Sequence, residues 1–101
     1  MINVILIEDH ALVRIGMHRM LDETPGITVV GDAASGNEGV KLARELKPHV
    51  VILDFKLPDI SGLEVTSKLL KVDPDVKILV VTAAVNDLVP FRLLEAGARG
   101  Y

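Results

Sequence analysis

Four short runs of Val, Ile and Leu place the strongest constraint on how this chain of 101 residues can fold. They span residues 2–7, 27–30, 50–53 and 76–81. Each run is continuously hydrophobic rather than alternating, which is typical of parallel strands that are buried on both faces. Segments with helical periodicity separate the runs, and the first has its apolar residues at Leu12, Ile15, Met20 and Leu21. The pattern predicts an α/β domain built on a doubly wound parallel sheet.

Polar and turn-forming residues support the same order of elements. Ser35 or Asn37 is placed to cap the second helix, and Ser61 is placed to cap the third. A fourth helix is predicted over residues 87–96, and residues 98–101 resemble the start of a fifth strand. Right-handed crossovers in a strand order 2-1-3-4-5 put the first helix alone on one face of the sheet.

Composition excludes several classes of function. The chain has no Cys, and its three His residues show no metal-ligand spacing, so disulfides, thiol catalysis and zinc-thiolate sites are excluded. A net charge of -3 and 3% aromatic residues argue against DNA binding by this segment itself. The first apolar run is too short for a membrane span and lacks the basic flank of a signal peptide. We therefore expect one cytoplasmic domain covering residues 1–101, with no membrane association.

Acidic residues follow two of the predicted strands. Glu8 and Asp9 follow the first strand, and Asp54 follows the third. In an open parallel sheet, ligands gather at such strand ends beside the point where strand order reverses. Three converging carboxylates need a cation, and oxygen ligands favour Mg²⁺. The hydroxyl of Thr82, at the end of the fourth strand, completes a set suited to phosphoryl chemistry on a carboxylate.

The sequence resembles a response regulator receiver domain, which has the CheY-like, flavodoxin-like fold. The resemblance covers all 101 residues and rests on five segments, at 7–10, 53–58, 61–63, 80–83 and 96–101. Residues 9–16, 19–21 and 26–31 further resemble the NarL/FixJ branch, especially regulators of the GacA and UvrY type. That likeness implies a LuxR-type helix-turn-helix output domain beyond this segment.

The resemblance implies a role for each site residue. Asp54 would be the phosphoacceptor, and Glu8, Asp9, Asp54 and the backbone carbonyl of Lys56 would hold Mg²⁺. Thr82 would hydrogen-bond the phosphoryl group, and Tyr101 would be the switch aromatic. The side chain of Lys56, together with Ala84, would flank the path of a hydrolytic water. Pro58 and Gly62 would shape the acceptor loop.

The first helix would carry the surface that a kinase contacts. His10, which follows the acidic pair, is assigned a structural or docking role rather than a catalytic one. Docking would use the exposed side of the first helix, where the candidates are Leu12, Arg14, Ile15 and His18. Leu12 and Ile15 are equally compatible with the core.

Three features depart from the family pattern. The acidic pair is Glu-Asp rather than the commoner Asp-Asp, and Pro90 shortens or kinks the start of the fourth helix. The family's lysine would lie shortly beyond Tyr101, so strand five is expected to be incomplete and helix five absent. Uncovered sheet beside the first helix then predicts self-association. Without the lysine, weak phosphotransfer is expected while Mg²⁺ still binds.

The expected function is that of a signalling module that assists its own Mg²⁺-dependent phosphorylation, and not that of an enzyme with a separate substrate. A sensor histidine kinase or phosphotransfer domain would donate the phosphoryl group to Asp54. The switch would act on a DNA-binding transcription regulator domain absent from this segment. A pseudo-receiver that binds partners without phosphorylation is the alternative. A flavodoxin-like small-molecule binder is disfavoured, because the turn after the first strand has no glycine-rich phosphate loop.

Overall fold

The computed structural model describes residues 1–81, and residues 82–101 are not described. Strands and helices alternate along the described chain, as the four apolar runs predict. The elements are β1 (Ile2–Ile7), α1 (Ala11–Asp22), β2 (Ile27–Ala33), α2 (Gly36–Leu46), β3 (Val50–Asp54), α3 (Gly62–Val72) and β4 (Lys77–Val81).

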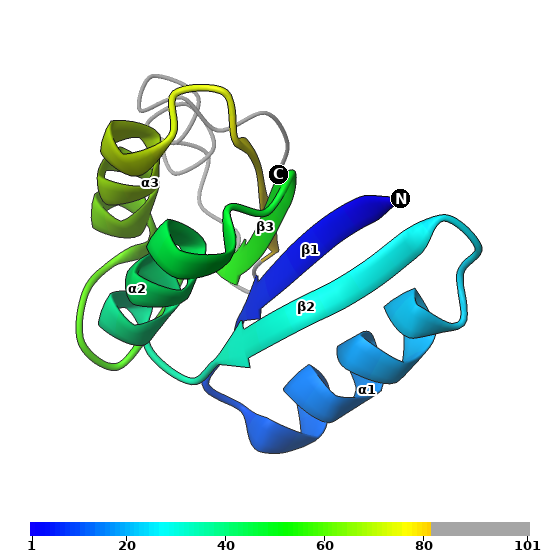
Figure 1. Ribbon diagram of the computed structural model, residues 1–101. Coiled ribbons are helices and arrows are strands. Elements are labelled where there is room, and N and C mark those ends of the chain that lie inside the picture. The colour runs from blue at the N-terminus through cyan, green and yellow to red at the C-terminus, as the bar shows by residue number, and fades with distance from the viewer. Residues whose placement is uncertain (82–101) are drawn as a thin grey trace.

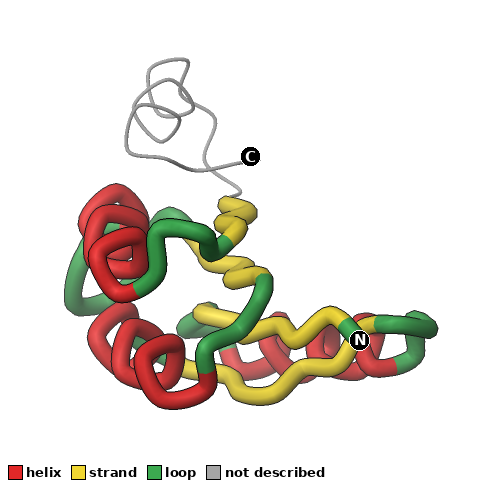
Figure 2. The backbone as a smooth tube through the Cα atoms, turned by 45° about the horizontal axis from the view of Figure 1, so that its top comes forward, coloured by secondary structure: helices red, strands yellow, loops and turns green. Residues whose placement is uncertain are grey.

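The strands form one parallel sheet in the order β2-β1-β3-β4. This order confirms the predicted doubly wound topology as far as β4. Helix α1 covers one face of the sheet, while α2 and α3 cover the other (Figures 1 and 2). The predicted fifth strand, the helix at 87–96 with Pro90, and the site residues Thr82, Ala84 and Tyr101 lie outside the described residues.

The core has two layers because successive strand residues face opposite sides of the sheet. The larger cluster lies under α2 and α3 and includes Ile5, Ile7, Val51, Leu53, Val65, Leu69, Ile78 and Val80. The smaller cluster lies under α1 and consists of Val4, Leu6, Val29 and Ile52, with Met17 and Leu21 packed against it. Helix α1 therefore covers much less apolar surface than the other two helices.

The orientation of α1 decides between two alternatives that the sequence left open. Leu12 and Ile15, candidates for either the docking surface or the core, are 84% and 61% exposed, and Met20, expected on the apolar face, is 62% exposed. Arg14 and His18, predicted as exposed docking candidates, instead turn partly inward to Asp32 of β2. The carboxylate of Asp32 under the helix recruits these basic side chains.

Two boundaries also differ from the prediction. Strand β2 continues to Ala33, three residues beyond the apolar run that predicted it, because Gly31, Asp32 and Ala33 still pair with β1. Strand β4 begins at Lys77, one residue later than predicted. Ser35 rather than Asn37 caps α2, and Ser61 caps α3 as predicted.

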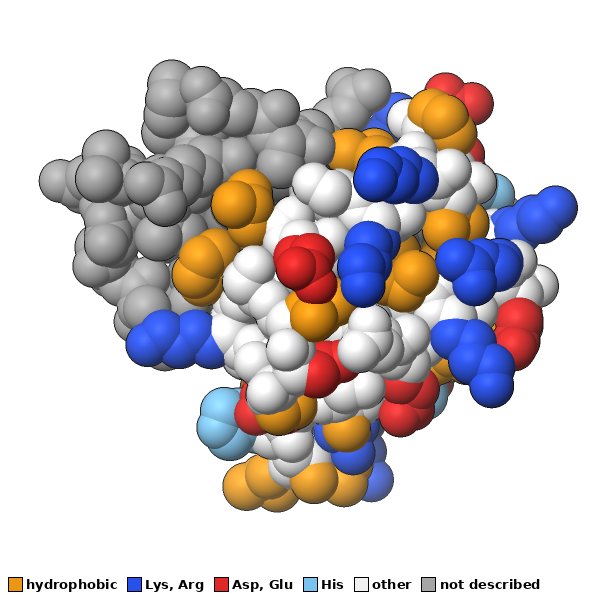
Figure 3. All heavy atoms as spheres, turned by 90° about the vertical axis from the view of Figure 1, so that its left-hand side faces the viewer, with side chains coloured by type: hydrophobic (Ala, Val, Ile, Leu, Met, Phe, Trp, Pro, Cys, Tyr) orange, Lys and Arg blue, Asp and Glu red, His pale blue; other side chains and the backbone are white. Residues whose placement is uncertain are grey.

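A basic groove of about 560 Å³ lies between α2 and α3. Lys and Arg side chains flank apolar ones on this face of the molecule (Figure 3). Its lining residues are Asn37, Val40, Lys41, Arg44, Lys68, Lys71 and Val72. The acidic strand-end residues do not contribute to it. Within residues 1–81, the helices are too short and polar to cross a bilayer.

Candidate metal centre

The acidic residues meet because β1 and β3 are neighbouring parallel strands. Ile7 pairs with Leu53, so the residues that follow, Glu8 and Asp54, leave the same edge of the sheet side by side. The backbone amide of Glu8 donates a hydrogen bond of 3.0 Å to the carbonyl of Ala33. This bond extends the β1–β2 ladder to the point where the acidic pair begins.

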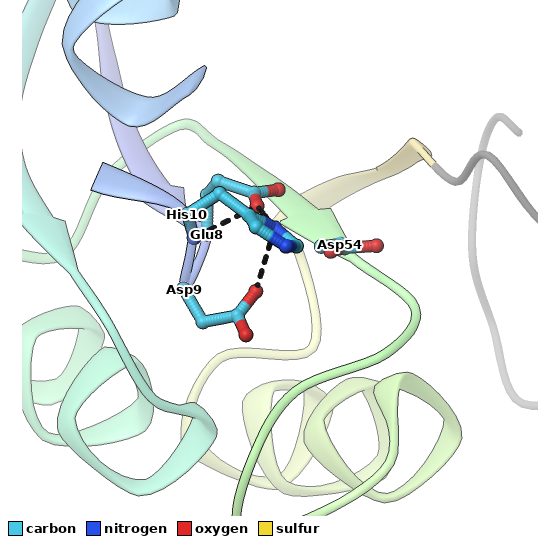
Figure 4. A group of neighbouring side chains, drawn as sticks. All are labelled: Glu8, Asp9, His10 and Asp54. Carbon is cyan, nitrogen blue, oxygen red and sulfur yellow. Dashed lines mark hydrogen bonds and ion pairs between the residues drawn. The ribbon is translucent and has the colours of Figure 1, made fainter. Parts of the chain in front are cut away.

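Glu8, Asp9, His10 and Asp54 converge at this edge, as Figure 4 shows. One ligand atom from each residue lies within 4.8 Å of the others. Glu8 is 8% exposed, although ionised carboxylates are rarely buried without a partner. The Oδ1 atom of Asp9 is buried, and no hydrogen-bond partner for it occurs in the described part of the chain. A buried oxygen without a donor is free to coordinate a cation.

The imidazole of His10 belongs to the cluster, which its predicted structural or docking role did not include. Its Nδ1 atom lies 2.8 Å from Oε1 of Glu8 and 3.2 Å from Oδ1 of Asp9, the latter an ion-pair distance without hydrogen-bond geometry. The His10 amide also donates to the same Glu8 oxygen at 3.1 Å. The sequence feature that could have indicated this place in the cluster is the position of His10 directly after the acidic pair.

Burial and negative charge together set the electrostatics of the cluster. Burial and then the charge of Glu8 raise the pKa of Asp54 above its ordinary value. The hydrogen bond to Glu8 and the charge of Asp9 raise the pKa of His10. Negative charge contributes to both shifts, and a cation bound here would offset it.

The donor set fits a hard divalent ion. Glu8, Asp9 and Asp54 supply carboxylate oxygens, which Mg²⁺ prefers over nitrogen and sulfur ligands. The Oδ1 of Asp9, which is buried and accepts no hydrogen bond from the described residues, is the observation that most favours coordination. The three acidic residues predicted as metal ligands therefore lie together, at distances that one ion can bridge.

The loop after β3 positions the remaining predicted residues. The Lys56 amide donates a hydrogen bond of 3.3 Å to Oδ1 of Asp54, while coordination by the Lys56 carbonyl stays a prediction. The Gly62 amide donates to the carbonyl of Phe55 at 2.8 Å. A Cβ atom at Gly62 would lie 2.8 Å from Cα of Phe55, so the close approach of loop and helix requires glycine. Thr82 and Tyr101 remain predictions.

Comparisons of sequence point to one family. The family described as "Response regulator receiver domain" matches residues 4–101. Response regulator GacA of Pseudomonas aeruginosa is 54% identical over 101 residues, which are 100% of this chain and 47% of that protein. Response regulator UvrY of Escherichia coli K12 is 44% identical over 101 residues, which are 100% of this chain and 46% of that protein. The chain spans about half the length of these curated relatives.

Solved structures agree with this result. A two-component response regulator of the LuxR family from Aurantimonas sp. SI85-9A1 superposes with a TM-score of 0.94 at 35% identity. The match covers 99% of this chain and 71% of that one. The signal receiver domain of the NarL response regulator from Mycobacterium tuberculosis superposes with a TM-score of 0.93 at 27% identity, covering 98% and 80% of the two chains.

Proposed function

Because the chain belongs to the response regulator receiver domain family, we propose that it is a phosphorylation switch whose phosphoacceptor is Asp54. The observation that carries the proposal is the convergence of Asp54 with Glu8 and Asp9 at one edge of the sheet. A nucleophilic carboxylate beside two further carboxylates is an arrangement that phosphoryl transfer can use once a cation is bound.

Glu8, Asp9 and Asp54 would hold Mg²⁺, with the carbonyl of Lys56 as a further ligand. When bound, Mg²⁺ offsets the charge of the carboxylates and of the incoming phosphoryl group. A hydrogen bond from the Lys56 amide orients the carboxylate of Asp54. Its other oxygen would attack the phosphorus of a phosphohistidine, so that an O–P bond forms and the N–P bond breaks with its electron pair left on the imidazole.

The donor we propose is a sensor histidine kinase or phosphotransfer domain in the cytoplasm. Leu12 and Ile15 project from the exposed side of α1, beside the acidic edge, and form an apolar surface for it to contact. Thr82 would hydrogen-bond the attached phosphoryl group, and Tyr101 would respond by turning inward. The output would be a DNA-binding transcription regulator domain, as the resemblance to the NarL/FixJ branch implies.

Phosphorylation with acetyl phosphate and Mg²⁺, followed by intact mass spectrometry, tests this proposal. Because phosphotransfer is expected to be weak, we expect a fraction of the wild type to gain the mass of one phosphoryl group and Asp54→Ala to gain none. Asp75→Ala is the matched control, because it also removes one aspartate but in the α3–β4 turn, and it should react like the wild type. A wild type that stays unmodified would contradict the proposal and favour a pseudo-receiver that only binds partners.

A further inference from the structure

Polar contacts add to the packing of Met17 and Leu21 in holding α1 to the sheet. None of its 12 residues is buried, and α1 is the only helix within residues 1–81 of which this is true. Helix α1 nevertheless follows directly on the turn that carries Glu8 and Asp9. The contacts that fix this helix therefore also bear on the acidic site.

Arg14 makes the contact nearest to the site. Its Nη1 donates a hydrogen bond of 2.7 Å to the backbone carbonyl of Glu8, and its Nε lies 3.5 Å from Oδ1 of Asp32. The side chain is 20% exposed, so water screens these contacts less than an ordinary surface ion pair. A charge-assisted bond of this length is among the stronger hydrogen bonds in proteins.

Further contacts hold Asp32 in place. Its Oδ2 lies 3.0 Å from Nδ1 of His18, and Nε2 of His18 lies 3.0 Å from Oδ2 of Asp22. The other oxygen of Asp22 accepts a hydrogen bond of 3.0 Å from the amide of Val29. A continuous set of polar contacts thus runs from the last turn of α1 to the guanidinium of Arg14.

The carbonyl that Arg14 binds belongs to the peptide unit between Glu8 and Asp9. Because a peptide unit is planar, holding its carbonyl restricts rotation about ψ of Glu8 and φ of Asp9, on which the directions of both acidic side chains depend. Restraining this carbonyl restrains the two carboxylates together, although Arg14 touches neither of them.

We propose that Arg14 is a positioning residue of the acidic site, which holds the Glu8–Asp9 peptide so that both carboxylates face Asp54. The inference deepens the proposed function, since it rests on that site binding a divalent ion. Asp32 acts through Arg14, and His18 and Asp22 support Asp32.

The sign of the change in Mg²⁺ affinity separates positioning from simple electrostatics. Arg14→Met keeps the length of the side chain but removes its charge and donors. Loss of a positive charge near a cation site would by itself tighten Mg²⁺ binding. Loss of a positioning contact would weaken it by roughly 10- to 100-fold, the usual effect of removing a group that orients metal ligands.

Titration of the protein with Mg²⁺, followed by NMR amide shifts, measures this affinity. Arg19→Met is the matched control, because it removes one positive charge from the last turn of the same helix, and it should leave the affinity within about twofold. The Mg²⁺ affinity of Arg14→Lys should lie between those of Arg14→Met and the wild type. An ammonium group can replace one of the two contacts of the guanidinium, to Glu8 or to Asp32, but not both at once. Unchanged or tighter binding by Arg14→Met would overturn the proposal.

Hydrogen exchange in the absence of Mg²⁺ makes the test independent of metal binding. The His10 amide, which donates to Glu8, should exchange faster in Arg14→Met than in Arg19→Met, while the amides of β3 stay equally protected. Equal exchange at His10 would also overturn the proposal. If Asp54 takes no phosphoryl group but Arg14→Met still shows both effects, the proposed function fails and the positioning role stands.

Discussion

At the scale of single residues, Asp54 lies where its own negative charge is disfavoured. Burial and the neighbouring charge of Glu8 raise its pKa. A carboxyl group with a raised pKa in the folded state stabilises the fold below its ordinary value of 3.8, and this contribution is lost as the pH rises through the folded pKa. At neutral pH and without a cation, the ionised Asp54 therefore opposes folding.

Asp54→Asn should stabilise the metal-free protein at pH 7. We expect a gain of about 1 kcal/mol, the interaction of two unit charges 4 Å apart in water, which is roughly 4–8 °C in Tm for a domain of this size. Mg²⁺ at about 100 times its Kd should stabilise the wild type by about 2.7 kcal/mol and the variant by less. Thermal denaturation with and without Mg²⁺ measures both effects. If Mg²⁺ stabilised the two proteins equally, Asp54 would not be a ligand of the metal.

At the scale of elements, Asp59 joins the loop after β3 to the start of α2. Its two carboxylate oxygens accept hydrogen bonds of 2.8 Å from the amides of Gly36 and Asn37. These amides have no partner within the helix, so the carboxylate satisfies them and favours the positive end of the helix dipole. Slight burial raises the pKa of Asp59, but these backbone hydrogen bonds outweigh it and lower the pKa overall.

Asp59→Asn should destabilise the protein by about 1 kcal/mol at pH 7, because the amide keeps one acceptor oxygen but loses the second acceptor and the negative charge. A lowered folded pKa gives stability that is present above the ordinary value of 3.8 and is lost as the pH falls through the folded pKa. The difference in free energy of unfolding between wild type and variant should therefore become smaller as the pH falls from 5 to 2. Urea denaturation at each pH measures this difference. Asp75→Asn, which changes another exposed aspartate, is the control. Its free energy of unfolding should differ less from that of the wild type, and the difference should change less with pH. A difference in free energy of unfolding that does not change with pH for Asp59→Asn would contradict the capping role of Asp59.

At the scale of the whole molecule, the two faces of the sheet are covered unequally. Ile78 and Val80 of β4 are buried in the core beneath α2 and α3. Leu79 and Val81 point to the face that carries α1, where they are 39% and 46% exposed. Their strand pairs only with β3 among the described elements. This strip of apolar sheet, together with the exposed apolar residues of α1, favours association between molecules.

Leu79→Lys should shift the protein toward the monomer. We expect the wild type to self-associate at high micromolar concentration and the variant to do so only at several-fold higher concentration. Light scattering over a concentration series measures the difference. Leu46→Lys, an exposed leucine at the end of α2, is the control and should associate as the wild type does. A wild type that remains monomeric throughout would contradict the prediction.

Local sequence was sufficient to predict most of the architecture. The continuous apolar runs predicted all four described strands, because burial on both faces leaves no room for polar residues. The caps at Ser35 and Ser61 follow from the chemistry of single residues. The acidic cluster was predictable too, since parallel strands bring Glu8 and Asp54 to the same edge of the sheet.

Helix α1 was predicted in place, but the sequence left open whether Leu12 and Ile15 face solvent or the core. The run that predicted β2 ended at Val30, before Asp32, so nothing local showed that a carboxylate would lie beneath the helix. Arg14 and His18 turn inward because Asp32 is there, and Leu12 and Ile15 turn outward as a result.

The amino-acid sequence by itself determined the strands, their parallel arrangement and the three carboxylates at one edge, because these follow from hydrophobic burial and right-handed crossovers. Only the tertiary structure decided how that edge is held together. The place of His10 among the carboxylates and the bond from Arg14 to the carbonyl of Glu8 depend on the orientation of side chains from several elements. Such contacts arise only after the elements have packed, and no local pattern in the chain encodes them.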